Sequence, residues 1–263
     1  MAHHIMRDPM TAWEDKLLRN PHEVADKRAR VRNMFAAIAP SYDINNRLHS
    51  LWQDQRWRRK AVKSSDLKPT DVVVDVACGT GDLSLAFARE LARLAAPLAG
   101  RVLGLDFTFE MLPIAERKCE IRNPRSEIRY INADAQSLPL PDRCADVVSI
   151  AFGIRNVQDP QAALREFHRV LRPGGRVIIL EFSLPTNHLL RALYNFYFRK
   201  ILPRTATLIS GDKTGAYKYL PESVNTFITR EAMVQMMCDA GFVRIVQFSM
   251  TFGVCICYRG VKP

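Results

Sequence analysis

The strongest constraint on the fold is a series of short apolar runs separated by helical patterns. The first run, largely apolar, covers residues 72–76, and further strand-like runs follow at 101–105, 128–131, 146–151 and 177–180. Runs that are apolar throughout are typical of strands buried on both faces of a parallel sheet. Between them, apolar residues recur with helical spacing, as at 83–94 and 160–171. The chain is therefore predicted to be an α/β protein with a doubly wound, mostly parallel sheet.

The two ends of the chain lack the alternation of strand and helix patterns seen in its middle. Residues 1–64 predict an N-terminal arm, frayed over residues 1–25, and a helical cap whose first helix should stop at Pro40. The sheet domain then covers residues 65–263, with a helical insertion at 186–228. Thr229 is a candidate N-cap of a helix reaching Ala240, and residues 242–249 and 252–258 predict an antiparallel hairpin at the sheet edge.

Charge and cysteine content narrow the function classes. The formal net charge is +11, a balance that favours nucleic acid, an anionic membrane surface or an anionic small molecule. The six cysteines form no paired C-x-x-C set, so we expect no metal site and buried thiols in a reducing cytoplasm. Residues 1–25 hold no apolar core of a secretory signal, and no apolar run is long enough to span a bilayer.

The loop after the first strand predicts a nucleotide-like cofactor. Gly79 and Gly81 stand where the chain leaves the strand and opens a helix, so the backbone is able to pass close to a ligand. Asp106 ends the next strand, where a carboxylate accepts hydrogen bonds from both hydroxyls of a ribose. Asp82 at the helix start repels a diphosphate but suits a cationic cofactor such as S-adenosylmethionine. By itself the glycine pattern also allows a plain strand-to-helix turn.

A family resemblance narrows this reading. Residues 70–183 resemble class I S-adenosylmethionine-dependent methyltransferases, which have a Rossmann-like sheet. A narrower match is carried by the blocks at residues 34–43, 152–157, 169–183, 217–223, 236–242 and 259–262. Through these blocks, residues 30–262 of the chain resemble the C-methyltransferases of ubiquinone and menaquinone biosynthesis.

The sequence departs from the family pattern at several positions near the expected acceptor pocket. Asn45, His49, Trp52 and Asp54 replace the usual Met, aliphatic residue, Gly and His, and Ala151 stands where the family has a Ser. These departures concern the shape of the acceptor pocket rather than the cofactor fold.

The resemblance implies an S-adenosylmethionine-dependent C-methyltransferase that converts demethylmenaquinol to menaquinol, or methylates the 2-methoxy-6-polyprenyl-benzoquinol of ubiquinone biosynthesis. The partner is then a polyprenyl quinol and not a nucleic acid. The location is cytoplasmic, with peripheral membrane contact through the aromatic-rich helix at 189–202 and its basic rim. Other small-molecule methyltransferases and a basic RNA-binding relative stay open as alternatives. The head group, tail length and oligomeric state stay open.

The resemblance also implies roles for individual residues. The cofactor-binding residues are predicted to be Asp75, Gly79, Thr80, Gly81, Asp106, Asp134 and Ala135. Asp134 should accept from the adenine amino group, the Ala135 N–H should meet a ring nitrogen, and Asp106 should hold the ribose.

Four residues are predicted to be catalytic. Arg155 is expected to stabilise a phenolate, while Asn156 and Tyr42 orient the ring hydroxyls. Asp43 or His49 is expected to take the proton through water. The Phe152–Asn156 segment lacks the N/D-P-P-Y motif of nucleic-acid amino methyltransferases, which argues against amine chemistry.

Overall fold

The computed structural model describes residues 12–94, 100–122 and 127–263. At its centre lies a seven-stranded sheet with the order β3-β2-β1-β4-β5-β7-β6. Its strands are β1 (Val72–Val76), β2 (Arg101–Asp106), β3 (Ile128–Asn132), β4 (Ala145–Ala151), β5 (Leu171–Phe182), β6 (Val243–Met250) and β7 (Cys255–Val261). The strands β1 to β5 pair in parallel, whereas β7 pairs antiparallel with β5 and β6. The predicted sheet and its edge hairpin are confirmed.

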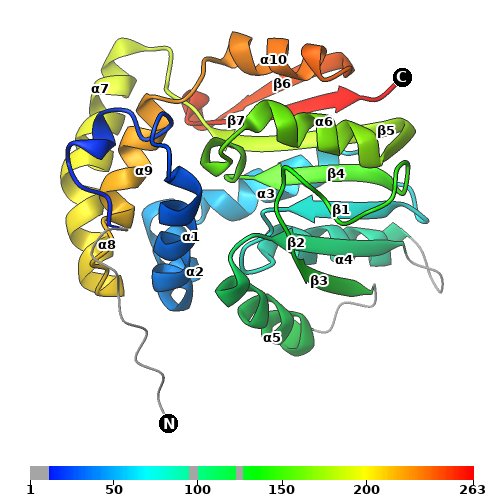
Figure 1. Ribbon diagram of the computed structural model, residues 1–263, viewed down its shortest axis with the longest axis horizontal. Coiled ribbons are helices and arrows are strands. Elements are labelled where there is room, and N and C mark those ends of the chain that lie inside the picture. Colours follow the sequence, from blue (N-terminus) through cyan, green and yellow to red (C-terminus); the bar gives the residue numbers. More distant parts are fainter. Residues whose placement is uncertain (1–11, 95–99, 123–126) are drawn as a thin grey trace.

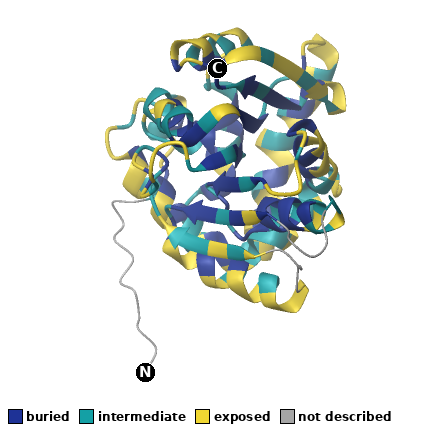
Figure 2. Cartoon of the chain, turned by 90° about the vertical axis from the view of Figure 1, so that its right-hand side faces the viewer, coloured by how far each residue is buried: buried dark blue, intermediate teal, exposed yellow. Residues whose placement is uncertain are grey.

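Helices cover both faces of this sheet (Figure 1). The helices α3 (Gln53–Ser64) and α4 (Asp82–Leu94) bury Trp57 and Phe87 against one face, and α6 (Pro160–Val170) and α10 (Arg230–Asp239) bury Phe167 and Met237 against the other. The helix α5 (Leu112–Arg122) contacts β3. Figure 2 shows the central strands as the most buried part of the chain.

The remaining helices form a cap beside the carboxyl ends of the parallel strands (Figure 1). They are α1 (Lys27–Ile38), α2 (Tyr42–His49), α7 (His188–Phe196), α8 (Leu202–Ser210) and α9 (Ala216–Asn225). Met34, Ile38, Leu202 and Tyr219 belong to a hydrophobic core of their own. Segments from the two ends of the chain therefore pack together over the sheet, because neither buries its apolar face alone.

Two sequence expectations about the cap are corrected. Residues 12–25 are not frayed: the backbone N–H of Trp13 donates to Thr214 O at 2.9 Å, and its ring centroid lies 4.4 Å from that of Tyr219. Residues 1–11 lie outside the described part. Pro40 does end α1, but the chain continues through a 3₁₀ turn (Ala39–Ser41) straight into α2, because proline is tolerated in a first turn.

The cysteine expectation holds only in part. Cys78, Cys255 and Cys257 are buried free thiols, while Cys119 and Cys144 are half-buried and Cys238 is exposed. In the described ranges, no helix has the length and apolar character needed to cross a membrane, and His, Cys, Asp and Glu side chains form no group of three able to hold a metal ion.

Candidate active site

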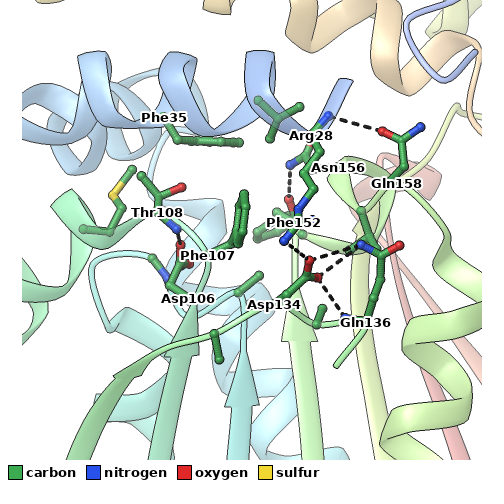
Figure 3. Close-up of a pocket in the computed structure, with 18 of the residues that line it drawn as sticks. Arg28, Phe35, Asp106, Phe107, Thr108, Asp134, Gln136, Phe152, Asn156 and Gln158 are labelled. Atoms are coloured by element: carbon green, nitrogen blue, oxygen red, sulfur yellow. Dashed lines mark hydrogen bonds and ion pairs between the residues drawn. The ribbon is translucent and has the colours of Figure 1, made fainter. Parts of the chain in front are cut away.

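A pocket of about 740 Å³ opens where β1, β2 and β4 end, with α1 lying over it (Figure 3). The strand order reverses here, since β1 has β2 on one side and β4 on the other, and open α/β sheets bind ligands at such a point. The lining residues that the argument uses are Arg28, Phe35, Tyr42, Gly79, Asp106, Phe107, Asp134, Ala135, Phe152 and Asn156.

The backbone at the rim of this pocket is bent into unusual conformations. Ala77 and Phe152 follow β1 and β4 with φ of 50° and 57°, and Gly79 has φ of 54°. A Cβ added to Gly153 would lie 2.6 Å from the Cβ of Ala77, so the two loops approach each other closely. Left-handed conformations at non-glycine residues are costly and cluster at functional sites. The strained loops are consistent with a site built for a ligand.

Gly81 is required by packing rather than by the pocket. Its φ is 79°, and an added Cβ would lie 2.5 Å from the Tyr130 hydroxyl oxygen and 3.0 Å from the Ala115 Cβ. It is not among the residues that line the pocket, whereas Gly79 is. Of the two predicted cofactor glycines, the structure therefore brings only Gly79 to the pocket.

Asp106 lies at the base of the pocket with both carboxylate oxygens already engaged. Its Oδ2 accepts from Gly79 N–H and its Oδ1 from Thr108 N–H, both at 2.7 Å. Burial raises the pKa of Asp106 to about 6, even though the two backbone donors lower it. A ribose hydroxyl would add a further donor to a carboxylate that has lost most of its water.

Asp75 is placed behind the pocket rather than in its wall. Its carboxylate accepts from the hydroxyls of Ser84, at 2.6 Å, and Ser149, at 2.7 Å. Burial raises its pKa to about 6 against those two hydrogen bonds. Asp75 therefore ties β1 to α4 and β4. It does not line the pocket, and its contact with the cofactor stays a prediction.

The far end of the pocket carries the predicted adenine-binding residues. Asp134 and Ala135 both line it, and Asp134 Oδ1 accepts from Gln136 N–H at 2.9 Å. The other oxygen, Oδ2, forms an ion pair with Arg28 at 2.8 Å (Figure 3). The Arg28 guanidinium also lies 4.5 Å from the centroid of the Phe107 ring. An adenine amino group would share Asp134 with Arg28, whose side chain is 55% exposed and has room to turn away.

Thr80 and Asp43 belong to a polar network beside the pocket instead of lining it. Thr80 donates its hydroxyl to Asp43 Oδ1 at 2.6 Å. Lys118 donates to Asp43 at 2.7 Å and to Asp82 at 2.6 Å, and Arg47 pairs with Asp82 at 3.0 Å. Although burial would raise the pKa of Asp82, the nearby Arg58, Lys118 and Arg47 charges lower it to about 2. The negative charge expected to face a cationic cofactor is therefore largely neutralised within the protein.

A second pocket, of about 660 Å³, lies between the cap and the sheet. Phe35, Tyr42 and Phe152 line both pockets, so the two cavities meet at these aromatic rings. The second pocket also contains Asn46, Ser50, Asp54, Arg58, Arg155, Phe182, Tyr217 and Tyr219. Aromatic walls with a few buried polar groups are typical of small-molecule sites.

Arg155 lines the second pocket, but its charge is already paired. Its Nη1 lies 2.6 Å from Glu181 Oε1 and 2.8 Å from Phe152 O, and both charged side chains are at least 95% buried. Asn156 lines the first pocket, donates to Phe152 O at 3.2 Å and accepts from Tyr219 Oη at 2.9 Å. The guanidinium expected to stabilise a phenolate is thus part of a buried ion pair, and a catalytic role of Arg155 stays a prediction.

The two candidate proton acceptors do not reach the second pocket. Asp43 is held by Thr80 and Lys118, and His49 Nδ1 is 3.1 Å from Tyr197 Oη. Neither residue lines either pocket. The carboxylate that does line the second pocket is Asp54, at the position where the family pattern has a histidine.

Sequence reasoning missed four residues of this site: Arg28, Arg58, Phe107 and Lys118. Phe107 directly follows the strand-end acid Asp106, so its place in the sequence was enough to predict that it lies at the pocket. Arg28, Arg58 and Lys118 come from helices whose placement over the loops depends on tertiary packing, so no local pattern marks them.

The residues present fit S-adenosylmethionine. A buried carboxylate lies at the strand end for ribose hydroxyls, and an apolar ring, Phe107, lies beside the edge formed by Asp134 and Ala135. Gly79 keeps the loop open, because it has no side chain to fill the pocket.

Comparison with known proteins gives a consistent picture. The model of the ubiE/COQ5 methyltransferase family matches residues 23–262. A demethylmenaquinone methyltransferase of Thermus thermophilus is 46% identical over 231 residues, which is 88% of this chain and all of that protein. A ubiquinone/menaquinone biosynthesis C-methyltransferase of Geobacter sp. strain M21 is 41% identical over 241 residues, or 92% of this chain and all of that protein.

Solved structures match the fold at much lower identity. An S-adenosylmethionine-dependent methyltransferase from Aquifex aeolicus is 18% identical, with a TM-score of 0.56 over 78% of this chain and 89% of that one. A phosphoethanolamine N-methyltransferase from Haemonchus contortus is 16% identical, with a TM-score of 0.57 over 78% of this chain and 52% of that one. These similarities support the fold alone.

Proposed function

The chain belongs to the ubiE/COQ5 methyltransferase family, and on that premise we propose that it methylates a ring carbon of a polyprenyl quinol, with demethylmenaquinol as the preferred acceptor. It is an S-adenosylmethionine-dependent enzyme of quinone biosynthesis. The observation that supports an aromatic acceptor beside the cofactor is the pair of pockets that meet at Phe35, Tyr42 and Phe152. One pocket suits an adenosine, and the other suits an aromatic ring.

S-adenosylmethionine, when bound, supplies an electrophilic methyl group carried on a positively charged sulfur. In the first pocket, Asp106 is the proposed acceptor of ribose hydrogen bonds, and Asp134 with the Ala135 N–H the proposed contacts of the adenine edge. Gly79 lets the backbone lie close to the ligand. Asp75, Thr80 and Gly81 support the same loop from behind, through Ser84, Asp43 and Tyr130 respectively.

In the second pocket, the proposal places the quinol ring among Tyr42, Phe152 and Phe182. Alignment and exclusion of water are then the main contributions of the protein. Tyr219 and Asn156 hold each other at 2.9 Å, and Asn156 also binds Phe152 O, so this pair fixes the loop between the pockets. Arg155 fixes the same carbonyl at 2.8 Å. The ring carbon gains its nucleophilic character when a neighbouring hydroxyl loses its proton.

Peripheral membrane contact is a further part of the proposal. Large apolar side chains are exposed on α2, on the turn after it, and on α7 and α8: Ile44, Leu48, Leu51, Trp52, Leu189, Leu193, Phe196 and Leu208. The basic side chains of Arg191, Arg199, Lys200 and Arg204 on or between α7 and α8 are exposed as well. Apolar residues beside basic ones suit the surface of an anionic bilayer, where the prenyl tail of the substrate resides.

The function is tested by transfer of labelled methyl from S-adenosylmethionine to short-chain quinols under anaerobic, reducing conditions. We expect a product one methyl heavier from demethylmenaquinol by mass spectrometry, and none from menaquinol, whose ring position is filled. The methoxy-polyprenyl-benzoquinol is tested in parallel, because the Geobacter relative is named for both pathways. Absence of transfer to both quinols would overturn the proposed function.

A further inference from the structure

The second pocket contains a buried cation with an unused hydrogen-bond donor. Arg58, on α3, is 7% exposed and lines this pocket. Its Nε is fully buried and has no hydrogen-bond partner within the described residues. A buried N–H donor without an acceptor costs free energy, and more so when the group is charged. The arrangement calls for an acceptor that the chain itself does not supply.

The nearest carboxylate does not fill this need. Asp54 Oδ2 lies 4.0 Å from Arg58 Nε, beyond hydrogen-bond distance. Its two oxygens instead accept from Ser50 Oγ at 3.0 Å and Gln55 Nε2 at 2.8 Å. Asp54 thus attracts the positive charge of Arg58 electrostatically but accepts no hydrogen bond from its Nε.

The other ionisable groups in this pocket do not compete for the role. Arg155 is neutralised by Glu181 at 2.6 Å. Burial raises the pKa of Tyr42, Tyr217 and Tyr219, so these phenols stay neutral at physiological pH.

Arg58 also lies at the right place along the pocket. Its guanidinium carbon is 5.3 Å from the centroid of the Phe152 ring, and Phe152 lines both pockets. A ligand oxygen bound by Arg58 would therefore sit next to the wall shared with the cofactor pocket.

We propose that Arg58 is a catalytic residue that donates hydrogen bonds to a ring oxygen of the acceptor and stabilises its phenolate form. This inference rests on the proposed function and assigns the oxyanion contact to Arg58 instead of Arg155. In the step concerned, the hydroxyl O–H bond breaks, the proton leaves to water, and the electron pair stays on the oxygen that faces Arg58. An opposite charge within about 4–6 Å lowers the pKa of an acid by roughly 1–3 pH units.

The test measures ionisation of a bound phenol without turnover. The probe is 4-nitro-1-naphthol, whose visible absorption distinguishes phenol from phenolate, titrated with the full-length protein in S-adenosylhomocysteine. We expect the pKa of the bound probe to fall by about 1–3 pH units in the wild type. Arg58→Gln should abolish this fall, and Arg58→Lys should recover part of it, because an ammonium keeps the charge but not the planar fork. Arg59→Ala, which removes an exposed charge from the same helix, should behave like the wild type.

An equal fall in the Arg58→Gln variant and the wild type would overturn the inference, as would a probe that does not bind the wild type. Thermal unfolding of each variant separates loss of the fold from loss of the contact, and recovery by Arg58→Lys is not expected of a purely structural residue. Failure of this inference and failure of the proposed function give different results. If the enzyme methylates demethylmenaquinol but the pKa of the bound probe does not depend on Arg58, only this inference is refuted. An Arg58-dependent probe pKa with no quinol methylation refutes the proposed function alone.

Discussion

Replacing Arg155 by Met should destabilise the protein strongly, because it leaves Glu181 buried without its partner. The two side chains are 5% and 3% exposed, and their charged atoms lie 2.6 Å apart. Glu181 would keep only backbone donors, from Phe182 at 2.8 Å and from residue 155 at 3.3 Å. Removing one member of such a buried pair costs about 3–5 kcal/mol.

For a chain of this size, each kcal/mol lowers the melting temperature by about 2–4 °C, so the expected fall is roughly 6–20 °C. The assay is thermal unfolding by calorimetry in a double-mutant cycle with Glu181→Gln. The melting temperature of the double variant should fall by much less than the sum of the falls in the two single variants, because the double variant contains no uncompensated charge. Arg129→Met breaks an exposed pair with Glu127 and should change the melting temperature little.

A melting temperature of Arg155→Met within about 2 °C of the wild type would refute this reasoning. The same variant tests the catalytic role predicted from the sequence. A contact of Arg155 with the reacting ring predicts that methyl transfer per folded molecule falls by about 10²–10³, with partial recovery in Arg155→Lys, whereas the assignment of the oxyanion contact to Arg58 predicts no such fall. Turnover like that of the wild type in the folded fraction would remove Arg155 from the catalytic residues and leave it a structural one.

Three further predictions concern the cofactor site, the polar network and the membrane surface. Asp106→Asn should weaken S-adenosylhomocysteine binding roughly tenfold or more in calorimetry. Wild-type affinity should fall as the pH drops below about 6, because Asp106 then gains a proton and loses the negative charge that accepts the ribose hydrogen bonds, whereas the affinity of Asp106→Asn should not change over this range. Lys118→Met should cost about 1–3 kcal/mol in urea unfolding, against little for the exposed Lys63→Met. The pKa of Asp82, about 2, lies below its ordinary value of 3.8, so the stability that Asp82 contributes is present above pH 3.8 and lost towards pH 2. If the free energy of unfolding falls equally with acid in the wild type and in Lys118→Met, the network does not stabilise the fold. Anionic vesicles should capture the protein at low salt and release it as added salt shortens the Debye length below about 8 Å. The Leu208→Ser variant, which removes an exposed apolar side chain, should bind these vesicles more weakly. Equal capture by neutral vesicles at every salt level would contradict the electrostatic contribution to binding.

The sequence by itself determined the sheet and the position of its ligand edge. Residues 72–76 and 146–151 are largely apolar, and this local pattern already implies parallel strands covered on both faces. Because parallel strands end at one edge, Gly79, Asp106 and Asn156 were predicted to share a site, and all three line the first pocket. Thr229 caps its helix as predicted, since an N-cap depends only on neighbours in the chain.

Only the tertiary structure decided which charges pair and which stay free. Arg155 and Glu181 are 26 residues apart, and Thr80 and Asp43 are 37 apart, so no local pattern connects them. Their pairing follows from how β4, β5 and the cap helices come together. The same packing buries Arg58 on α3 without an acceptor, although in the sequence it is one of two adjacent arginines. Periodicity assigns a side chain to a face of its helix, but its ionic partner depends on distances of a few ångströms between elements, and only the packed fold sets these.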